Sequence, residues 1–378
     1  MIPLSLYIHV PWCIKKCPYC DFNSHKSPDS LPEKDYITAL ISDLETDIAR
    51  YSSREIVSLF IGGGTPSLLS AEAYSTLISA LKQLLKFAPN IEITMEANPG
   101  TVEQNRFTDY RALGINRLSL GIQSFNPKHL KSLGRIHDDK QAHTAIHAAR
   151  NAGFENINLD LMHSLPNQTL QQGLDDLKTA ISYQPEHLSW YQLTIEPNTV
   201  FYKTQPQLPS EDDDFQLEVE GLALLEQAHF TRYEISAFSK PNQQAKHNLN
   251  YWLFGDYFGI GAGAHGKLTN HQCVVRTRKH RQPKDYMSHD KPFLAAEEII
   301  EPNELVFEYM LNTTRLEQAI PHQLFCETTH LNMDKLLPKL QKAEDKGLIQ
   351  LTDTSWQVTK FGRQFTNDLQ ALFLPSME

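Results

Sequence analysis

The stretch YIHVPWCIKKCPYCDF, residues 7–22, decides how this sequence is interpreted. It places Cys13, Cys17 and Cys20 within eight residues, directly after an apolar segment with the pattern of a β-strand. The whole chain of 378 residues contains five cysteines. An odd total with three thiols in one short loop is a poor disulfide framework, so the loop predicts metal binding or redox chemistry.

Composition and charge restrict the class of protein. Apolar residues make up 40% of the chain, and its length allows two domains. Acidic residues outnumber basic ones by 45 to 35, which argues against nucleic-acid binding. No apolar run approaches the roughly 18 residues of a membrane span, and no basic segment precedes the apolar start as in a signal peptide. We therefore expect a cytoplasmic protein without a membrane span.

Strand and helix patterns alternate over residues 1–238, which we expect to form the first domain. Predicted strands cover residues 4–10, 55–61, 91–97, 116–122, 156–162 and 187–195, and predicted helices cover 33–51, 70–87, 139–153 and 169–183. Strand–helix units that repeat in this way produce a parallel sheet. Six units are fewer than the eight of a closed barrel, so the pattern predicts an α/β fold with a partial (β/α)6 TIM-type barrel.

Polar residues or glycines stand where successive predicted strands end. The cysteine loop follows the first strand, the glycine-rich segment 62–65 follows the second, and Glu96, Gln123 and Asp160 end the next three. Each of them alone has a structural explanation, such as a tight turn or an acid at a helix N-terminus. Because parallel strands end at the same rim of a barrel, the whole set predicts a binding site there.

The spacing C-x3-C-x2-C suits either of two metal sites. Zinc needs a fourth ligand, and His25 could complete a Cys3His site in a zinc-stabilised binding module. A 4Fe–4S cluster held by three cysteines instead keeps one iron open for another ligand. The residues alone leave both possibilities open.

The chain resembles the radical S-adenosylmethionine (radical SAM) proteins, in which such a cysteine loop follows the first strand and a glycine-rich segment the second. The resemblance extends over nearly the whole chain to the HemW-type haem chaperones, in the oxygen-independent coproporphyrinogen III oxidase-like branch. The segments that carry it are, in order, YIHVPWCIKKCPYCDF, FIGGGTPSLL, MEANPGT, RLSLGIQSF, LGRIH, NLDLMHSLP and HNLNYW.

This resemblance implies roles for individual residues. It implies that Cys13, Cys17 and Cys20 hold a 4Fe–4S cluster, whose open iron binds SAM, and that an electron donor reduces the cluster. Positions that contact SAM in this branch correspond to Tyr7, Tyr19, Gly63, Gly64, Thr65, Glu96, Gln123, Arg135 and Asp160. Glycine allows close approach of the backbone, acids accept hydrogen bonds from ammonium or ribose groups, and arginine pairs with a carboxylate.

Two features distinguish this chain from the oxidases of the branch. The oxidases carry a fourth cysteine two residues after the third, where this chain has Phe22. The segment HNLNYW, residues 247–252, is a feature of the HemW-type proteins. The resemblance therefore implies haem binding, with His247 as axial ligand, and delivery to acceptor haemoproteins, possibly those of the respiratory chain. The alternative function is coproporphyrinogen III oxidation. The alternative explanation of His247 is a polar histidine beside core aromatics.

The remaining sequence predicts two further parts. Residues 239–301 are expected to form an irregular, glycine-rich bridge, in which GIGAGAHG (259–266) either approaches adenine or makes a tight turn. RTRKHRQPK (276–284) is expected to be a solvated loop, and the alternative is a surface for haem propionates or an acidic acceptor. Residues 302–378 predict two helices, a hairpin and a last helix, as in an α+β winged-helix-like domain. The mixed charge of its second helix argues against DNA binding. Cys273 and Cys326 are expected to be ordinary buried thiols.

Overall fold

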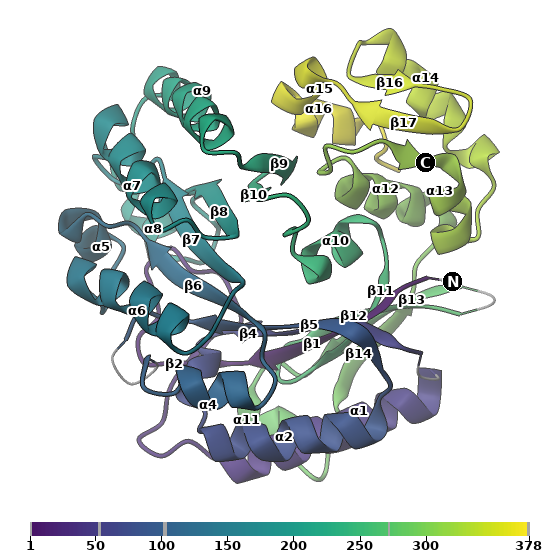
Figure 1. Ribbon diagram of the computed structural model, residues 1–378. Coiled ribbons are helices and arrows are strands. Elements are labelled where there is room, and N and C mark those ends of the chain that lie inside the picture. Colours follow the sequence, from purple (N-terminus) through teal and green to yellow (C-terminus); the bar gives the residue numbers. More distant parts are fainter. Residues whose placement is uncertain (1, 52–53, 101–103, 271–272, 376–378) are drawn as a thin grey trace.

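The computed structural model describes residues 2–51, 54–100, 104–270 and 273–375, and it is built around a 12-stranded sheet with the order β14-β13-β12-β11-β1-β4-β5-β6-β7-β8-β10-β9. Six neighbouring strands run parallel: β1 (Leu4–Val10), β4 (Ile56–Gly63), β5 (Phe87–Ala97), β6 (Arg117–Gln123), β7 (Ile157–His163) and β8 (His187–Gln192). The sheet curves without closing, so the predicted partial (β/α)6 barrel is confirmed (Figure 1).

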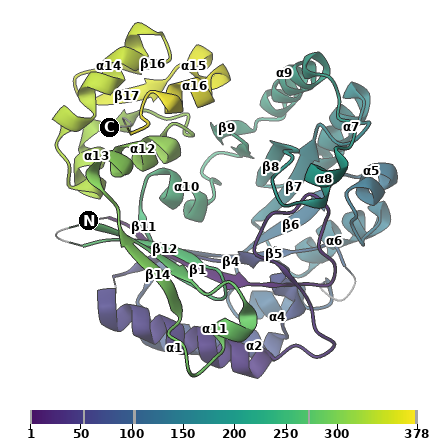
Figure 2. The same ribbon diagram turned by 180° about the vertical axis from the view of Figure 1, so that it is seen from behind.

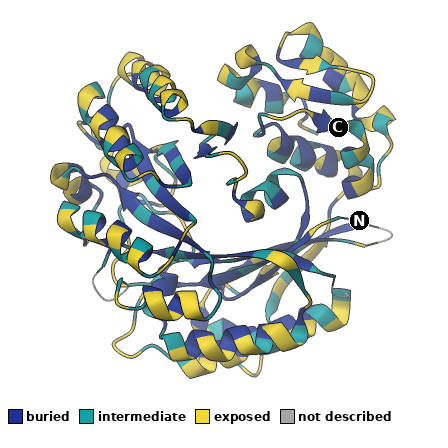
Figure 3. Ribbon diagram, in the orientation of Figure 1, coloured by how far each residue is buried: buried dark blue, intermediate teal, exposed yellow. Residues whose placement is uncertain are grey.

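Helices connect these strands and cover the outer face of the sheet. They are α1 (Glu33–Tyr51), α2 (Ala71–Leu84), α4 (Phe107–Ala112), α5 (Pro127–Ser132), α6 (Asp139–Asn151) and α7 (Leu170–Ser182). Their apolar sides are buried against the sheet while the opposite sides are exposed (Figure 3). Ser70 caps the N-terminus of α2, and its hydroxyl accepts a hydrogen bond from the Ala73 amide at 3.1 Å.

The two faces of each strand carry different side chains. Leu4, Leu6 and Ile8 of β1 belong to the main apolar core, whereas the alternate residues Tyr7 and His9 lie on the other face. That inner face is the polar interior of the barrel.

The prediction that residues 239–301 form an irregular bridge is wrong. The segment contains α10 (Lys246–Trp252), β11 (Asp256–Ile260), β12 (His265–Thr269), β13 (Val274–Lys279), α11 (Pro283–Tyr286) and β14 (Leu294–Ile299). β11 lies parallel to β1, and the other three strands continue the sheet beyond it. β11 pairs with the edge of β1 that would otherwise expose unsatisfied backbone groups.

The basic run at 276–284 is also not simply a solvated loop. Lys279 lies in β13 and is fully buried, with its Nζ 2.8 Å from Asp47 Oδ1 and in contact with Asp43. Tyr286 donates a hydrogen bond to Asp43 Oδ2 at 2.6 Å. This buried ionic group joins α1 to β13 and α11, which are far from α1 in the sequence.

After β8 the chain forms α8 (Val200–Thr204), α9 (Glu211–Gln227), β9 (Thr231–Glu234) and β10 (Ala237–Ser239). The C-terminal domain has its own apolar core. It contains α12 (Pro302–Thr313), β15 (Ile320–Pro321), α13 (His322–Thr329), η2 (Met333–Lys335), α14 (Leu337–Asp345), β16 (Ile349–Leu351), β17 (Ser355–Val358), α15 (Lys360–Gln364) and α16 (Thr366–Ala371). The predicted hairpin is β16–β17, and α13 was not predicted.

This domain stands opposite the α7–α9 side of the barrel, with α10 between them (Figure 2). Cys273 and Cys326 are half-buried rather than fully buried. Among the described residues, no helix is both long and apolar enough to cross a membrane.

Candidate functional site

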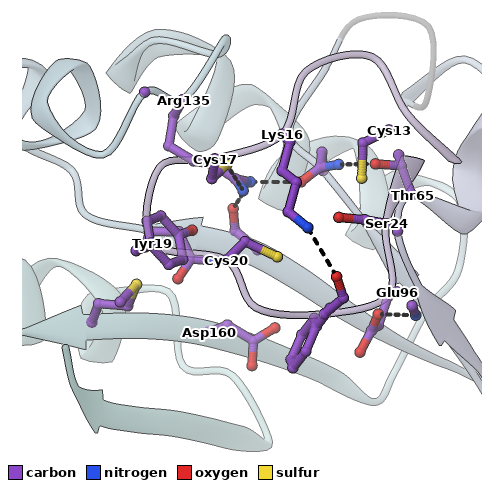
Figure 4. A pocket seen from close by; sticks show the side chains of 18 of the residues that line it. Cys13, Lys16, Cys17, Tyr19, Cys20, Ser24, Thr65, Glu96, Arg135 and Asp160 are labelled. Atoms are coloured by element: carbon purple, nitrogen blue, oxygen red, sulfur yellow. Dashed lines mark hydrogen bonds between the residues drawn. The ribbon is translucent and has the colours of Figure 1, made fainter. Parts of the chain in front are cut away.

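A cavity of about 580 Å³ opens where the parallel strands of the barrel end. The cysteine loop covers one side of it, and β5 and β7 bring Glu96 and Asp160 to another (Figure 4). We call this cavity the SAM pocket, after the ligand that the resemblance implies. The predicted site residues that line it are Cys13, Cys17, Tyr19, Cys20, Gly63, Gly64, Thr65, Glu96, Gln123, Arg135 and Asp160. Of the thirteen predicted residues, Tyr7 and His247 do not line it.

The backbone holds the cysteine loop in place. Trp12 and Cys13 form β2, which pairs with β3 (His25–Lys26), and the Thr65 amide donates to the Trp12 carbonyl at 2.8 Å. All three cysteines are free thiols and partly exposed. Burial raises the pKa of the Cys13 and Cys20 thiols above its ordinary value. A bound metal would supply the positive charge that removes their protons.

His25, the fourth ligand of the zinc alternative, does not line the pocket. Within the described part of the chain, no three His, Cys, Asp or Glu side chains are placed to hold a single metal ion. The His25 ring instead lies with Nε2 3.1 Å from the Arg281 carbonyl oxygen. Three thiols that line one cavity suit a cluster of several irons that keeps one iron open to a further ligand.

Two partly buried carboxyl groups, Glu96 and Asp160, line the pocket. Glu96 Oε2 accepts a hydrogen bond from the Gly63 amide at 3.1 Å, while burial and the nearby Asp160 raise the pKa of Glu96 to about 8. Asp160 accepts hydrogen bonds from Ser119 Oγ and Asn158 Nδ2, both at 2.8 Å. Burial raises the pKa of Asp160 as well. A ligand with ammonium or sulfonium charge would stabilise both groups in their ionised form.

The glycine segment is required by packing within the chain. Gly63 has φ 113°, and a Cβ there would lie 2.6 Å from the His9 ring. A Cβ on Gly64 would lie 2.5 Å from the Trp12 carbonyl oxygen. Any side chain would therefore displace the strand end and the cysteine loop.

Arg135 and Gln123 form another wall of the pocket. Arg135 donates from Nη2 to Asn98 Oδ1 at 2.5 Å and to the Gly121 carbonyl at 2.8 Å, and its Nη1 lies 3.7 Å from Cys17 Sγ. Gln123 has φ 67°, which turns the chain at the end of β6. The guanidinium is thereby fixed beside the cysteine loop.

Tyr7 and His247 lie beneath the pocket, inside the barrel. The Tyr7 hydroxyl is 2.9 Å from His9 Nδ1. His247 is only 2% exposed, with Nδ1 3.0 Å from Ser58 Oγ and its ring stacked on Phe60 at 5.0 Å. Its Nε2 has no hydrogen-bond partner among the described residues. Neither side chain reaches its predicted ligand site in this conformation.

Sequence reasoning missed several pocket residues: Asn98, Ser119, Gly121, Ser189 and Tyr191. Ser119, Gly121, Ser189 and Tyr191 occupy alternate positions of β6 and β8, so the period of two along predicted strands could have found them. None of residues 259–266 lines the pocket. They comprise the end of β11, the turn at 261–264 and the start of β12, and the Gly261 amide donates to the Tyr286 hydroxyl at 3.0 Å.

Comparisons with known proteins agree with this geometry. The model of the Radical SAM superfamily matches residues 7–180, and that of the HemN C-terminal domain matches residues 300–365. The chain is 48% identical over 373 residues to the heme chaperone HemW of Escherichia coli, and each chain is covered to 98%. It is 35% identical over 381 residues to the heme chaperone HemW of Bacillus subtilis, with 98% and 99% covered.

Among solved structures, coproporphyrinogen III oxidase (HemN) of Escherichia coli superimposes with a TM-score of 0.83 at 23% identity, covering 98% of this chain and 90% of the other. This likeness shows a shared fold. The fold and the cysteine-lined pocket thus define a radical SAM protein. Within that class, the chain belongs to the HemW family. Membership of the superfamily implies a 4Fe–4S cluster and SAM, and the donor set described above fits both.

Proposed function

We propose that this chain is a haem chaperone, which binds haem and delivers it to acceptor haemoproteins. The observation that carries the proposal is the full-length similarity, at 48% identity, to proteins described as heme chaperones. Phe22 supports it, because this side chain stands where the oxidases of the branch are expected to have a fourth cysteine. The similarity of fold to HemN does not distinguish a chaperone from an oxidase.

Within this proposal, Cys13, Cys17 and Cys20 hold the 4Fe–4S cluster at the SAM pocket. When bound, the cluster supplies the electron that reductive cleavage of SAM requires. Glu96 and Asp160 attract the cationic part of SAM, and Arg135 attracts its carboxylate. Tyr19, Gly63, Gly64, Thr65 and Gln123 shape the rest of the site.

From the resemblance of the HNLNYW segment, we also propose His247 as the axial ligand of haem. In the structure, α10 is held over the barrel interior, because the Glu92 carboxylate accepts hydrogen bonds from the backbone amides of Lys246 and His247 at 3.1 and 3.2 Å. Coordination by His247 therefore requires α10 to move away from Glu92 and Phe60. The same proposal includes an acceptor in the respiratory chain, an electron donor that reduces the cluster, and a cytoplasmic location.

Anaerobic reconstitution followed by haem titration tests the proposal. The reconstituted chain should contain about four irons per chain, bind one haem and release no carbon dioxide from coproporphyrinogen III. A His247→Ala variant tests the axial ligand. His289→Ala, at an exposed histidine, serves as its control. A chain that binds no haem, or that converts coproporphyrinogen III to protoporphyrinogen, would overturn the chaperone function.

A further inference from the structure

Three buried polar side chains lie in the barrel interior beneath the SAM pocket. They are Asn158 of β7, His187 of β8 and Tyr233 of β9, and none of them lines the pocket. Asn158 and His187 stand opposite one another in the paired strands β7 and β8. Because burying a polar group costs free energy unless it is hydrogen-bonded, the partners of these side chains indicate what they do there.

The three side chains form a hydrogen-bonded chain that begins at Asp160 in the SAM pocket. Asn158 Nδ2 lies 2.8 Å from Asp160 Oδ1, and Asn158 Oδ1 lies 2.6 Å from His187 Nδ1. His187 Nε2 lies 2.8 Å from the Tyr233 hydroxyl. The same hydroxyl accepts a hydrogen bond from the backbone amide of Ala245, the N-cap residue of α10, at 3.4 Å. Four hydrogen bonds therefore connect the SAM pocket to the start of α10.

The carboxylate fixes the direction of these hydrogen bonds. An ionised Asp160 can only accept, so the amide nitrogen of Asn158 faces it and the amide oxygen faces His187. His187 Nδ1 then carries the proton, which leaves Nε2 to accept from the Tyr233 hydroxyl. Burial and the charge of Arg117 lower the pKa of His187 well below its ordinary value, in agreement with a neutral ring. Every group in the chain thus donates toward Asp160.

Hydrogen bonds that point in one direction strengthen one another. An ionised carboxylate is a stronger acceptor than a neutral one, so its charge polarises Asn158, His187 and Tyr233 in turn. Burial raises the pKa of Asp160 in the unliganded chain, and a cationic ligand in the SAM pocket favours the ionised form. Bound SAM should therefore strengthen each hydrogen bond, including the longest one at Ala245.

Tyr233 joins this chain to two other parts of the molecule. Its hydroxyl contacts α10, and its carbonyl oxygen accepts a hydrogen bond from the Glu317 amide of the C-terminal domain at 3.1 Å. β9 is the last strand of the sheet, so Tyr233 lies where the barrel, α10 and the C-terminal domain meet.

We propose that His187 is a positioning residue that couples the SAM pocket to α10. SAM bound beside Asp160 holds the start of α10 against β9, and by thermodynamic reciprocity a displaced α10 weakens SAM binding. The coupling rests on the SAM pocket of the proposed function and does not depend on haem. If His247 coordinates haem only after α10 moves, bound SAM opposes that movement.

Hydrogen exchange followed by mass spectrometry tests the coupling in the full, anaerobically reconstituted chain. SAM should slow exchange of the backbone amides of residues 245–252 by about fivefold or more. Tyr233→Phe removes one hydroxyl and little volume, so it should abolish this SAM effect and weaken SAM binding by a similar factor. Tyr309→Phe is the matched control, because this buried hydroxyl has no hydrogen-bond partner among the described residues.

Two substitutions of His187 separate hydrogen bonding from packing. Glutamine can donate to Asn158 and accept from Tyr233, so His187→Gln should keep the SAM effect, whereas His187→Phe should lose it. Equal responses to SAM in these two variants would contradict the role of His187. Iron content and the far-ultraviolet circular dichroism spectrum show whether each variant is folded.

The outcomes distinguish the coupling from the pocket, with SAM binding measured separately by equilibrium dialysis. If the wild type binds SAM but exchange of α10 is unchanged, the coupling is overturned and the SAM pocket stands. The same conclusion follows if Tyr233→Phe responds to SAM as the wild type does. If the wild type binds no SAM, the pocket and the coupling both fall.

Discussion

The Tyr191 hydroxyl donates a hydrogen bond to Gln123 Oε1 at 3.0 Å. Tyr191 lines both the SAM pocket and a cavity of about 840 Å³ between the barrel and the C-terminal domain. This contact joins the ends of β6 and β8 at the wall between the two cavities. Because both cavities border on the same side chain, a ligand in one can affect the position of Tyr191 toward the other.

We expect Tyr191→Phe to weaken SAM binding about fivefold, because a lost neutral hydrogen bond costs about 1 kcal/mol and Gln123 is no longer oriented. Equilibrium dialysis of SAM against the reconstituted chain measures the change. Tyr202→Phe, at an exposed tyrosine, is the matched control. Unchanged SAM affinity in Tyr191→Phe would show that Gln123 is oriented by other groups.

A second prediction concerns the pH dependence of SAM binding. The pKa of Glu96 is about 8 in the unliganded chain, so this carboxyl is largely protonated at pH 7. A cationic ligand favours the ionised form, so binding should release a proton and affinity should rise as the pH increases toward 8. Calorimetry in buffers of different ionisation enthalpy counts the proton.

Glu96→Gln is the matched variant for this prediction. It should bind SAM at least about tenfold more weakly, without the pH dependence. It should also stabilise the unliganded fold at pH 8, because a group whose folded pKa is raised loses stability as the pH rises through that value. A Tm at pH 8 that does not increase would contradict the assigned pKa.

Removing the clustered thiols should abolish the cluster but leave the fold intact. Cys13, Cys17 and Cys20 are partly exposed and outside the apolar core, so a triple Cys→Ser variant leaves no buried cavity. We expect near-zero iron and sulfide by chemical analysis with an unchanged far-ultraviolet circular dichroism spectrum. Cys326→Ser should keep full iron content. Full iron in the triple variant would refute the assignment of the cluster ligands.

The buried ionic group of Lys279, Asp43 and Asp47 should be essential for stability. Lys279→Met leaves two carboxyls without their cation, and such a loss typically costs about 3–5 kcal/mol. Burial already raises the pKa of both acids, that of Asp47 to about 6. The loss should therefore be greatest above pH 7 and smaller near pH 5, where the acids take up protons.

Urea unfolding at pH 5 and pH 8 measures this difference. Lys291→Met, which breaks an exposed pair with Asp285, should cost little at either pH. Equal losses for Lys279→Met at the two pH values would contradict the explanation by charge.

The order of strands in the barrel was predictable because each strand–helix unit is a local pattern. The long periodic helix over 33–51 was predicted with the bounds that α1 has. The site residues at strand ends were predictable for the same reason, since parallel connections bring those ends to one rim. Eleven of the thirteen predicted site residues line the pocket.

Predictions failed where a residue's position depends on segments far away in the sequence. Tyr7 lies three residues before the end of β1, so the rise along the strand leaves its ring below the rim, among His9 and Phe60. The strand β11 has only five residues, and its pairing partner β1 is about 250 residues away. Nothing local could show that Lys279 would be buried against α1.

The sequence by itself determined the barrel, the cysteine loop and the family, because periodicity and motif spacing are properties of neighbouring residues. Only the tertiary structure decided that His247 points into the barrel interior while Trp252 faces a cleft shared with the C-terminal domain. The physical reason is that one short helix packs against two domains at once. Which side chain of α10 contacts each domain depends on how the whole chain folds around this helix.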